Sequence, residues 1–371
     1  MILNQNVTYC KAVAIILMVL GHCCGQAIPY CTQTIYMFHI PLFFFLSGFC
    51  FKNKYLANPE DFVIRRFKGL WWPFVKWSLI FMLLHNFFVE IGFYGTQCGA
   101  QSDDGLYYRD EYIMRFLDIV FDMSGNEQLL GGYWFLNALL GGALIAFVLL
   151  CIRAKIKNYN IKITPYLVDF MILGLLIILM MLTNEYTRRY CGVIFPRTLL
   201  AAIMFICGSF IAEYKLQRFN WLQSILAFSV VVIGGFYWRL EPASYFSEGM
   251  TMNIPLYIIT ALLGTWVIYS LPWYLIREGS AFAKLIDFIG NNTLTILTWH
   301  FVWFKFVSFI LIKVYHLPDY YLSMFPTITE YSDKGWWFVY FGVGVTCPLL
   351  SLLIINKIGA ALKRYKKNDF E

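Results

Sequence analysis

Lys11 and His22 bound an otherwise apolar stretch of the chain, residues 12–21. Eleven residues apart, they are separated by about three turns of an α-helix, roughly 16 Å along its axis, so both fall on nearly the same helical face. A neutral imidazole can take a proton from a hydroxyl group near neutral pH, or act as a nucleophile. A lysine three turns away can contact a phosphate or a thioester. The segment therefore points to chemistry within a membrane, with the two side chains at different depths of one cavity.

The composition indicates what must position this pair. Of the 371 residues, 60% are hydrophobic and only 14% are charged, which excludes a soluble globular domain. Each crossing of a bilayer needs roughly 17–25 mostly apolar residues. The chain is therefore expected to be an all-α, polytopic membrane bundle of about ten transmembrane helices. They are expected near residues 7–25, 35–51, 70–93, 129–151, 164–183, 197–213, 221–238, 253–271, 286–312 and 336–360.

Successive crossings place the connections alternately on the two sides of the membrane. The basic residues divide unevenly between these two sides. Most Lys and Arg residues fall in one set of connections and in the C-terminal tail, whereas the opposite connections are acidic. Under the positive-inside rule, both termini are expected to be cytoplasmic, in a multi-pass protein of the inner (plasma) membrane. The net charge of +7 then reflects contact with anionic membrane lipid, and no nucleic-acid partner is expected.

The connections between the expected crossings are short. The longest, residues 95–128, is expected to carry a surface helix over residues 110–121, either lying on the membrane or packed over the mouth of the bundle. The first apolar segment lacks the basic start and the cleavage site of a signal peptide, so it is expected to persist as the first helix. We therefore expect a single integral membrane domain over residues 1–371, with no appended soluble domain and no internal repeat.

Ten cysteines occur without a regular spacing, and the sequence predicts no metal site. Most of the cysteines are expected to pack as small apolar side chains. Cys31, Cys98 and Cys191 fall on the expected outer side, where a pair can oxidise. The sequence leaves open whether any of them do.

Polar side chains at membrane depth are costly and usually face an interior cavity, so they are the candidates for a functional site. These candidates are Lys11, His22, His39, Lys76, His85, Asp169, Arg197, His300 and Lys305. Packing or contact with the membrane edge is a simple explanation for four of them, namely Lys76, His85, Asp169 and Lys305.

The remaining histidines have more specific settings. His39 lies beside Pro41, whose missing N–H frees a carbonyl group and favours a polar chamber. His300 is interpreted either as a partner of the site or as a packed interior group. His22 is the strongest candidate, because it lies near the expected outer end of the first span, where it can meet an acceptor hydroxyl.

The chain resembles the membrane-bound acyltransferase-3 family, in which a basic residue, ten further residues and a histidine mark the first span. Here that pattern reads Lys11 to His22, and residues 38–49 (FHIPLFFFLSGF) are similar to the second span of the family. Further similar segments are Arg65-Arg66-Phe67-Lys68 with Trp72-Pro73, Tyr133-Trp134-Phe135-Leu136, Arg197 with Phe205-Ile206-Cys207-Gly208, and Ile289-Gly290-Asn291-Asn292 followed by His300.

The resemblance implies a membrane-bound O-acyltransferase. Such an enzyme moves an acyl group, with acetyl expected, from cytoplasmic acyl-CoA to a hydroxyl of a cell-envelope glycan, glycolipid or other extracytoplasmic acceptor. Acyl-CoA, here expected to be acetyl-CoA, is then a donor substrate, and no tightly bound cofactor is expected. The resemblance makes His22 catalytic, as general base or transient acyl carrier, and assigns Lys11 to the donor. Substrate-binding roles fall on His39, Trp134, Arg197 and His300.

Two positions depart from the family pattern. Lys11 stands where arginine is most common, which keeps the charge but loses the planar bidentate fork. Thr8 stands where an acidic residue is common, so a partner that would orient the basic side chain is missing. Donor binding by Lys11 is therefore the less secure of the two assignments.

Two alternatives stay open at this point. Ten crossings with a few buried ionisable groups also suit a secondary transporter or flippase for a lipid-linked sugar. A basic cytoplasmic cluster suits docking of the CoA nucleotide, although the positive-inside rule alone also predicts it. Its members are Lys52, Lys54, Arg65, Arg66 and Lys68.

Overall fold

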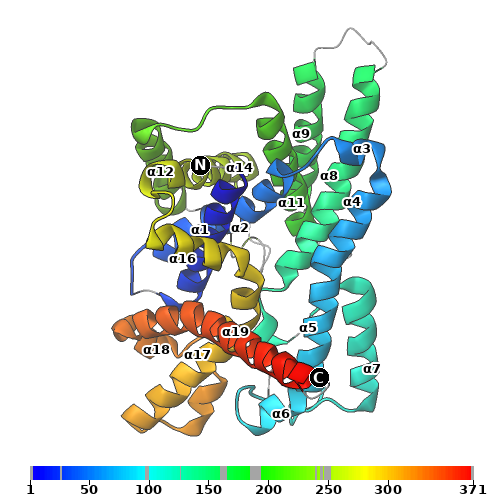
Figure 1. Ribbon diagram of the computed structural model, residues 1–371. Coiled ribbons are helices and arrows are strands. Elements are labelled where there is room, and N and C mark those ends of the chain that lie inside the picture. The colour runs from blue at the N-terminus through cyan, green and yellow to red at the C-terminus, as the bar shows by residue number, and fades with distance from the viewer. Residues whose placement is uncertain are drawn as a thin grey trace.

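The computed structural model describes residues 3–25, 27–96, 100–125, 127–158, 165–183, 194–238, 240–242, 245 and 252–368. Within these residues every regular element is a helix, and the helices pack into a bundle (Figure 1). The all-α class predicted from the composition is therefore confirmed.

The longer helices enclose the interior of the protein, and the shorter ones connect them. The longer helices are α1 (Leu3–Cys23), α2 (Cys31–Phe49), α4 (Pro59–Arg66), α5 (Trp72–Leu83), α8 (Trp134–Asn158), α9 (Pro165–Met181), α11 (Ile194–Tyr214), α12 (Trp221–Phe236), α14 (Ile254–Ser270), α16 (Ala281–Asn291), α17 (Thr293–Tyr315) and α19 (Trp337–Asn368). The shorter α-helices are α3 (Lys54–Ala57), α6 (His85–Glu90), α7 (Arg109–Leu117), α15 (Pro272–Leu275) and α18 (Thr329–Tyr331). The π-helical turns are η1 (Phe67–Trp71), η2 (Asp118–Asp122) and η5 (Ser332–Trp336), and the 3-10 turns are η3 (Gln128–Leu130) and η4 (Asp319–Ser323).

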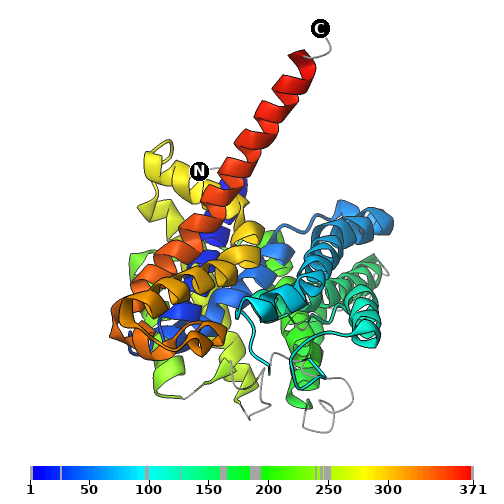
Figure 2. The ribbon, with the colours of Figure 1, turned by 90° about the horizontal axis from the view of Figure 1, so that it is seen from below.

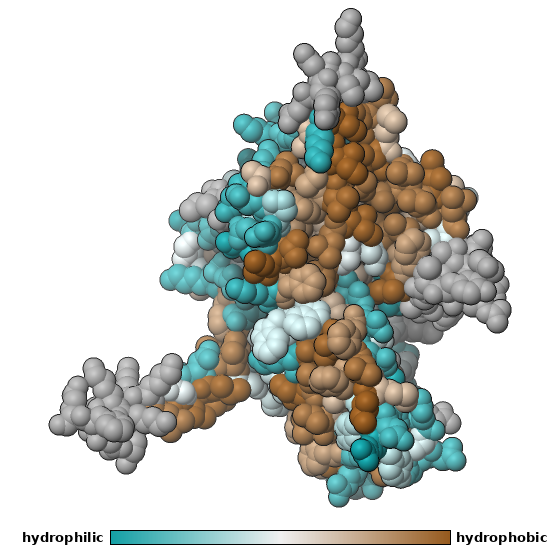
Figure 3. Space-filling model, turned by 90° about the vertical axis from the view of Figure 1, so that its right-hand side faces the viewer, coloured by the Kyte–Doolittle hydropathy of each residue, from teal (hydrophilic) through white to brown (hydrophobic). Residues whose placement is uncertain are grey.

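Several helices have the length and composition of membrane spans. Among the described residues, six segments qualify: Gln5–Cys23, Trp134–Lys157, Ile194–Tyr214, Ile254–Leu275, Thr293–Tyr315 and Thr329–Leu362. Two shorter apolar helices are Tyr166–Met181 and Trp221–Phe236. Hydrophobic side chains also cover much of the molecular face in Figure 3, and the C-terminal part of α19 extends away from the other helices in Figure 2. The chain is a multi-pass membrane protein.

Two of the expected crossings do not qualify as membrane spans by length and composition. The expected span over residues 35–51 is α2, which is not among the six segments and carries the polar residues Gln33 and His39. The expected span over residues 70–93 is also not among them, because α5 ends at Leu83 and the chain continues as the short helix α6.

The span expected near residues 286–312 is present as Thr293–Tyr315, but it begins later than expected, because the chain breaks at Asn292 between α16 and α17. The Asn292 side chain donates a hydrogen bond to the Phe288 carbonyl at 2.8 Å. The end of α16 also packs so closely on α1 that a methyl group at Gly290 would overlap the carbonyl of Thr8. This tertiary contact turns α16 against α1 and lets α17 begin in a new direction.

Glycines set the closest helix contact of the bundle interior, between α2 and α11. A methyl group at Gly48 would overlap the backbone of Phe205, and one at Gly208 would overlap the carbonyl of Phe45. Helices approach this closely where a glycine on one helix leaves room for the backbone of the other. The contact fixes the position of the C-terminal half of α2, which lines the site described below.

The connection that follows α6 is held by a buried hydrogen-bond network. His85 contacts Glu127 through Nδ1 (3.1 Å) and the Gly105 carbonyl through Nε2 (3.0 Å), and its ring stacks on Tyr107 at 3.5 Å. His85 therefore has the structural role predicted for it. The helix expected over residues 110–121 is also present, as α7 followed by η2.

Candidate active site

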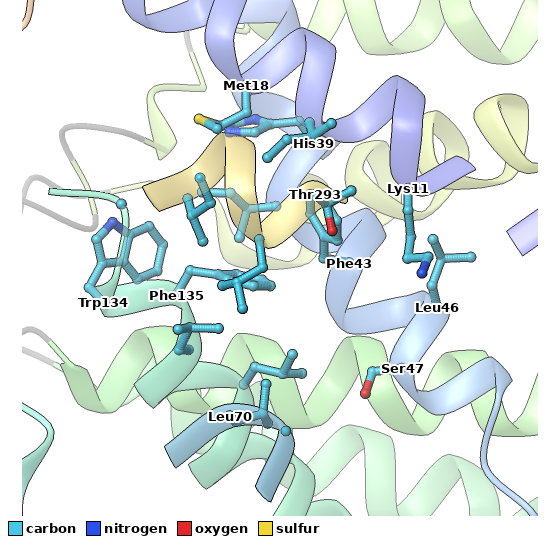
Figure 4. A pocket seen from close by; sticks show the side chains of 18 of the residues that line it. Lys11, Met18, His39, Phe43, Leu46, Ser47, Leu70, Trp134, Phe135 and Thr293 are labelled. Atoms are coloured by element: carbon cyan, nitrogen blue, oxygen red, sulfur yellow. The ribbon is translucent and has the colours of Figure 1, made fainter. Parts of the chain in front are cut away.

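A cavity of about 480 Å³ lies among α1, α2, α8 and α17. Its polar and charged lining residues are Lys11, His22, Tyr36, His39, Ser47, Cys50, Arg66, Trp134 and Thr293. Figure 4 shows Lys11 and Ser47 on one side of the cavity, Trp134 on the opposite side, and His39 beside Met18. No Asp or Glu of the described chain lines it. The cavity thus combines an apolar wall with cations and imidazoles.

One face of α1 forms a wall of this cavity. It contributes Lys11, Ile15, Met18 and His22, a spacing of three or four residues that places all of them on the same helical face. The prediction that Lys11 and His22 share one face is confirmed. The two ionisable groups lie at opposite ends of this stripe, with two apolar side chains between them.

Rings from α2 and α17 surround His22. Its ring lies 5.7 Å from that of His300 at an interplanar angle of 23°, and 5.0 Å from that of Phe301. The Tyr36 hydroxyl is 3.5 Å from Nδ1 of His22, at the outer limit of a hydrogen bond. No carboxylate contacts His22 among the residues that the structure describes. Aromatic and imidazole packing therefore orients this ring.

His39 lines the same cavity from α2. Its Nδ1 donates a hydrogen bond to the Ile35 carbonyl at 2.8 Å, so Nε2 is the ring nitrogen that can accept a proton. The ring also contacts Tyr36 edge to face, at 5.0 Å. Helix α2 continues through Pro41, whose ring leaves the carbonyl of Met37 without its helical N–H partner.

His300 lies behind His22 and does not line the cavity. It is fully buried, and its Nδ1 donates to the Ile296 carbonyl at 2.9 Å. Its Nε2 is buried with no hydrogen-bond partner among the described residues. The ring is thus held in one orientation, with its stacking contact to His22 as its connection to the site.

Trp134 and Arg197 form a pair at the wall of the cavity. Trp134, at the start of α8, lines the cavity, and the Arg197 guanidinium of α11 lies 4.2 Å from the centre of its ring. Arg197 itself is not a lining residue. Arg197 contacts the Trp134 indole, and the indole contacts the cavity. The position of the guanidinium over the ring is typical of a cation–π contact.

Arg66 is a lining residue of the cavity that was not among the candidate site residues predicted from the sequence. Its Nη1 donates to Ser47 Oγ at 2.7 Å, and its guanidinium stacks on Phe62 and Phe205 at 4.9 and 5.4 Å. No carboxylate pairs with Arg66 in the described part of the chain. The spacing of Phe62 and Arg66 on one face of α4 was the available signal. Lys11 and Arg66 together favour an anionic ligand.

The remaining intramembrane candidates have structural roles, as predicted. Lys305 donates to the carbonyls of Leu322 and Met324, both at 2.9 Å. Asp169 pairs with Arg153. Lys76 is exposed beside its neighbouring tryptophan ring. None of these side chains lines the cavity.

The cysteines add little to the site. Cys31 is partly exposed and free, and Cys24 is free and lies with its Sγ 3.2 Å from the Thr32 hydroxyl. Cys98 and Cys191 lie outside the described residues. Over the residues that the structure describes, no group of three or more His, Cys, Asp or Glu side chains is placed to hold a metal ion.

Comparison with known families gives one match. The model of the acyltransferase 3 domain matches residues 4–356, nearly the whole chain. No curated protein and no solved structure matches this sequence.

Proposed function

Because the chain belongs to the acyltransferase 3 family of membrane-bound acyltransferases, we propose that it transfers an acyl group, with acetyl expected, from acyl-CoA to an extracytoplasmic hydroxyl. The acceptor is a cell-envelope glycan, a glycolipid or a related molecule. The observation that carries the proposal is the cavity itself, which Lys11 and His22 line at two depths of one helix.

The charge of the cavity supports an acyl-CoA donor. Lys11 and Arg66 line it, and no acidic side chain of the described residues offsets them there. CoA carries its phosphates at the end remote from the thioester, so two cations near one end of an apolar cavity suit it. Arginine offers a planar fork to phosphate, and Lys11 offers a point charge to the phosphate or to the thioester carbonyl.

The chemical step is assigned to His22. In a direct route, the acceptor oxygen attacks the thioester carbon while His22 takes the hydroxyl proton. The C–S bond then breaks, and His22 returns this proton to the CoA sulfur, which leaves the ester and a free thiol. In a two-step route, a ring nitrogen of His22 attacks the thioester carbon, and the C–S bond breaks to release the CoA thiolate. The acceptor oxygen then attacks the same carbon, the C–N bond to His22 breaks, and the hydroxyl proton goes to the thiolate.

The other residues of the site shape the chamber. His39 and Tyr36 contribute polar groups beside His22, and Trp134, backed by Arg197, forms the opposite wall. His300 acts through His22, whose ring it stacks upon. We propose that the acceptor sugar packs on the Trp134 indole, since aromatic faces are common partners of apolar sugar surfaces.

For the whole chain, we propose one integral domain over residues 1–371 with ten crossings of the inner membrane and both termini cytoplasmic. The uneven division of Lys and Arg supports this topology. The N-terminal Lys11 end of the cavity then faces the cytoplasmic donor, and the His22 end faces the external acceptor.

The test is acyl transfer by membranes that contain wild-type or variant protein. With labelled acyl-CoA and an envelope-glycan acceptor, we expect wild-type membranes to release free CoA and His22→Ala membranes to lose at least about a hundredfold in kcat. His316→Asn is the matched control, because His316 is exposed beyond the end of α17. Normal turnover by His22→Ala would overturn the catalytic assignment. An intact thioester during movement of a lipid-linked sugar would indicate a transporter.

A further inference from the structure

A second hollow lies beside the α11–α12 connection, where that connection meets α14 and α15. Its volume is about 460 Å³. We call it the Trp273 groove, and its lining residues are Leu216, Gln217, Arg218, Tyr269, Trp273 and Tyr274. None of these residues belongs to the cavity that holds Lys11 and His22.

Hydrogen bonds between the connection and α14–α15 fix the walls of the groove. The Trp266 indole N–H donates to the Gln217 carbonyl at 3.3 Å, and the Tyr274 hydroxyl donates to the Phe219 carbonyl at 3.0 Å. The Phe219 N–H donates to Ser270 Oγ at 3.0 Å. Three bonds across this junction make a preformed groove, which reduces the ordering cost of binding.

The groove offers one cation, one unused donor and several aromatic faces. The Arg218 guanidinium lies 4.3 Å from the centre of the Trp273 ring. No carboxylate pairs with Arg218 in the described part of the chain. The indole nitrogen of Trp273 is buried and lacks a hydrogen-bond partner there. An aromatic base that carries a phosphate matches this set, because it stacks on rings, accepts from N–H groups and pairs with arginine.

The groove adjoins the Lys11 end of the cavity. The ring of its lining residue Tyr269 contacts the ring of Phe49 at 5.0 Å, and Phe49 precedes Cys50, which lines the cavity. From α1, the Asn6 side chain donates to the Tyr269 carbonyl at 3.0 Å. The groove and the Lys11 end of the cavity are therefore neighbours across the contact of Tyr269 with Phe49.

A smaller hollow of about 180 Å³, beside α8 and α11, has no arginine without a carboxylate partner among the described residues. Its arginine, Arg153, already pairs with Asp169 and Glu213. A guanidinium with two carboxylate partners has little charge left for a phosphate. Of these two hollows, the Trp273 groove is the one suited to an anionic ligand.

We propose that the Trp273 groove binds the phosphorylated adenosine end of the acyl-CoA donor. This inference rests on the proposed function, since it places one part of the same substrate. Arg218 binds the 3′-phosphate, and the adenine packs on the aromatic wall with one of its ring nitrogens accepting from the Trp273 indole. The pantetheine arm then extends past Tyr269 into the cavity, which brings the thioester toward Lys11 and His22.

The test compares two donors in protein reconstituted into phosphatidylcholine nanodiscs. Acetyl-CoA carries the adenosine end, and acetyl-phosphopantetheine lacks it. We expect Arg218→Ala to raise the KM for acetyl-CoA about tenfold with kcat unchanged, and to leave the KM for acetyl-phosphopantetheine unchanged. Trp273→Phe keeps an aromatic face but removes the N–H, so it raises only the KM for acetyl-CoA. Arg277→Ala is the control, because Arg277 is an exposed basic residue outside the groove.

Equal effects of Arg218→Ala on both donors, or no effect on either, would overturn the proposal. A defect that arises only when anionic lipid is added to the nanodiscs would assign the groove to lipid phosphate instead. Direct binding of 3′,5′-ADP separates this proposal from the enzyme assignment. Wild-type protein that binds 3′,5′-ADP through Arg218, yet transfers no acyl group, upholds the groove and overturns the proposed function.

Discussion

His22 differs in its surroundings from a histidine held by a carboxylate. The rings of His300 and Phe301 and the Tyr36 hydroxyl are its neighbours, and no acidic side chain contacts it among the described residues. A catalytic base must be held in a productive orientation, which second-layer hydrogen bonds usually provide. Under the proposed mechanism ring packing takes that part, so we expect the shape of His300 to matter more than its ability to carry a proton.

This difference predicts the behaviour of His300 variants. We expect His300→Phe to retain kcat within about threefold, because a ring of similar size keeps the stacking contact and removes a buried, unpartnered nitrogen. We expect His300→Ala to lower kcat about tenfold or more, because the His22 ring loses its support. The measurement is acyl transfer per amount of folded protein in the membrane. Equal loss in both variants would mean that the imidazole nitrogen itself is required.

Arg66 allows a second prediction at this scale. Arg66→Lys keeps the charge but loses the bond geometry to Ser47 and the stacking on Phe62. We expect the KM for acyl-CoA to rise severalfold while the KM for the acceptor stays unchanged. Arg65→Lys is the matched control, since Arg65 is exposed and pairs with Asp61. A larger effect on the acceptor than on the donor would contradict donor binding by Arg66.

The site was only partly predictable from the residues. Lys11 and His22 could be placed on one face because helical periodicity fixes relative direction within one segment. Arg66 could not be assigned to the cavity, because its role depends on how α4 lies against α2, which no local pattern encodes. His300 was recognised as buried, but its place behind His22 depends on the packing of α17 against α1.

At the scale of elements, the contact between α2 and α11 holds the helix that forms one wall of the cavity. The two helices meet through Gly48 and Gly208, where neither has room for a methyl group. Since α2 carries His39 and Ser47 on the same helix, movement of α2 also displaces part of the site. Stability and activity are therefore coupled at this contact.

We expect Gly48→Ala and Gly208→Ala each to lower the free energy of unfolding by about 1–3 kcal/mol, because an added methyl group forces the backbones apart. Thermal unfolding in detergent measures the change. Gly174→Ala is the control, because nothing lies within 4 Å of a Cβ atom at Gly174 in α9. Unchanged stability in both interface variants would show that the helices separate at little cost.

The helices were predictable to a large extent, and their interruptions were not. Long apolar segments predict helices because backbone groups in a bilayer must be satisfied internally. The sequence is apolar on both sides of the break at Asn292, so hydropathy alone predicts an uninterrupted helix there. The break arises from the contact of Gly290 with α1, a long-range effect. The end of α5 at Leu83 was also missed.

At the scale of the whole molecule, the site draws on helices far apart in the chain. Helix α1 supplies Lys11 and His22, α8 supplies Trp134, and α17 supplies Thr293. The family match over residues 4–356 covers all of them. No single segment could reveal this assembly, although the motifs along the sequence identified its members.

The proposed orientation gives a prediction for the complete protein. Cysteines introduced at Asp104 and Arg277, two exposed positions, should react oppositely with a membrane-impermeant maleimide added to intact cells. We expect labelling at position 104 and none at position 277, because ten crossings place them on different sides. The parent protein has its native cysteines replaced by serine. Labelling at position 277 alone would invert the topology and reverse the donor and acceptor ends.

The apolar stripe between Lys11 and His22 has a consequence for the bioenergetics of the cell. Ile15 and Met18 on α1 face a cavity that Ile40 and Phe43 of α2 also line. Narrow apolar passages resist continuous filling by water. An enzyme that receives one substrate from each face of an energised membrane must block a continuous water path, because protons would otherwise flow through it down their gradient. Under the proposed function, we expect the side chains that guide the acyl arm also to keep the protein from conducting ions.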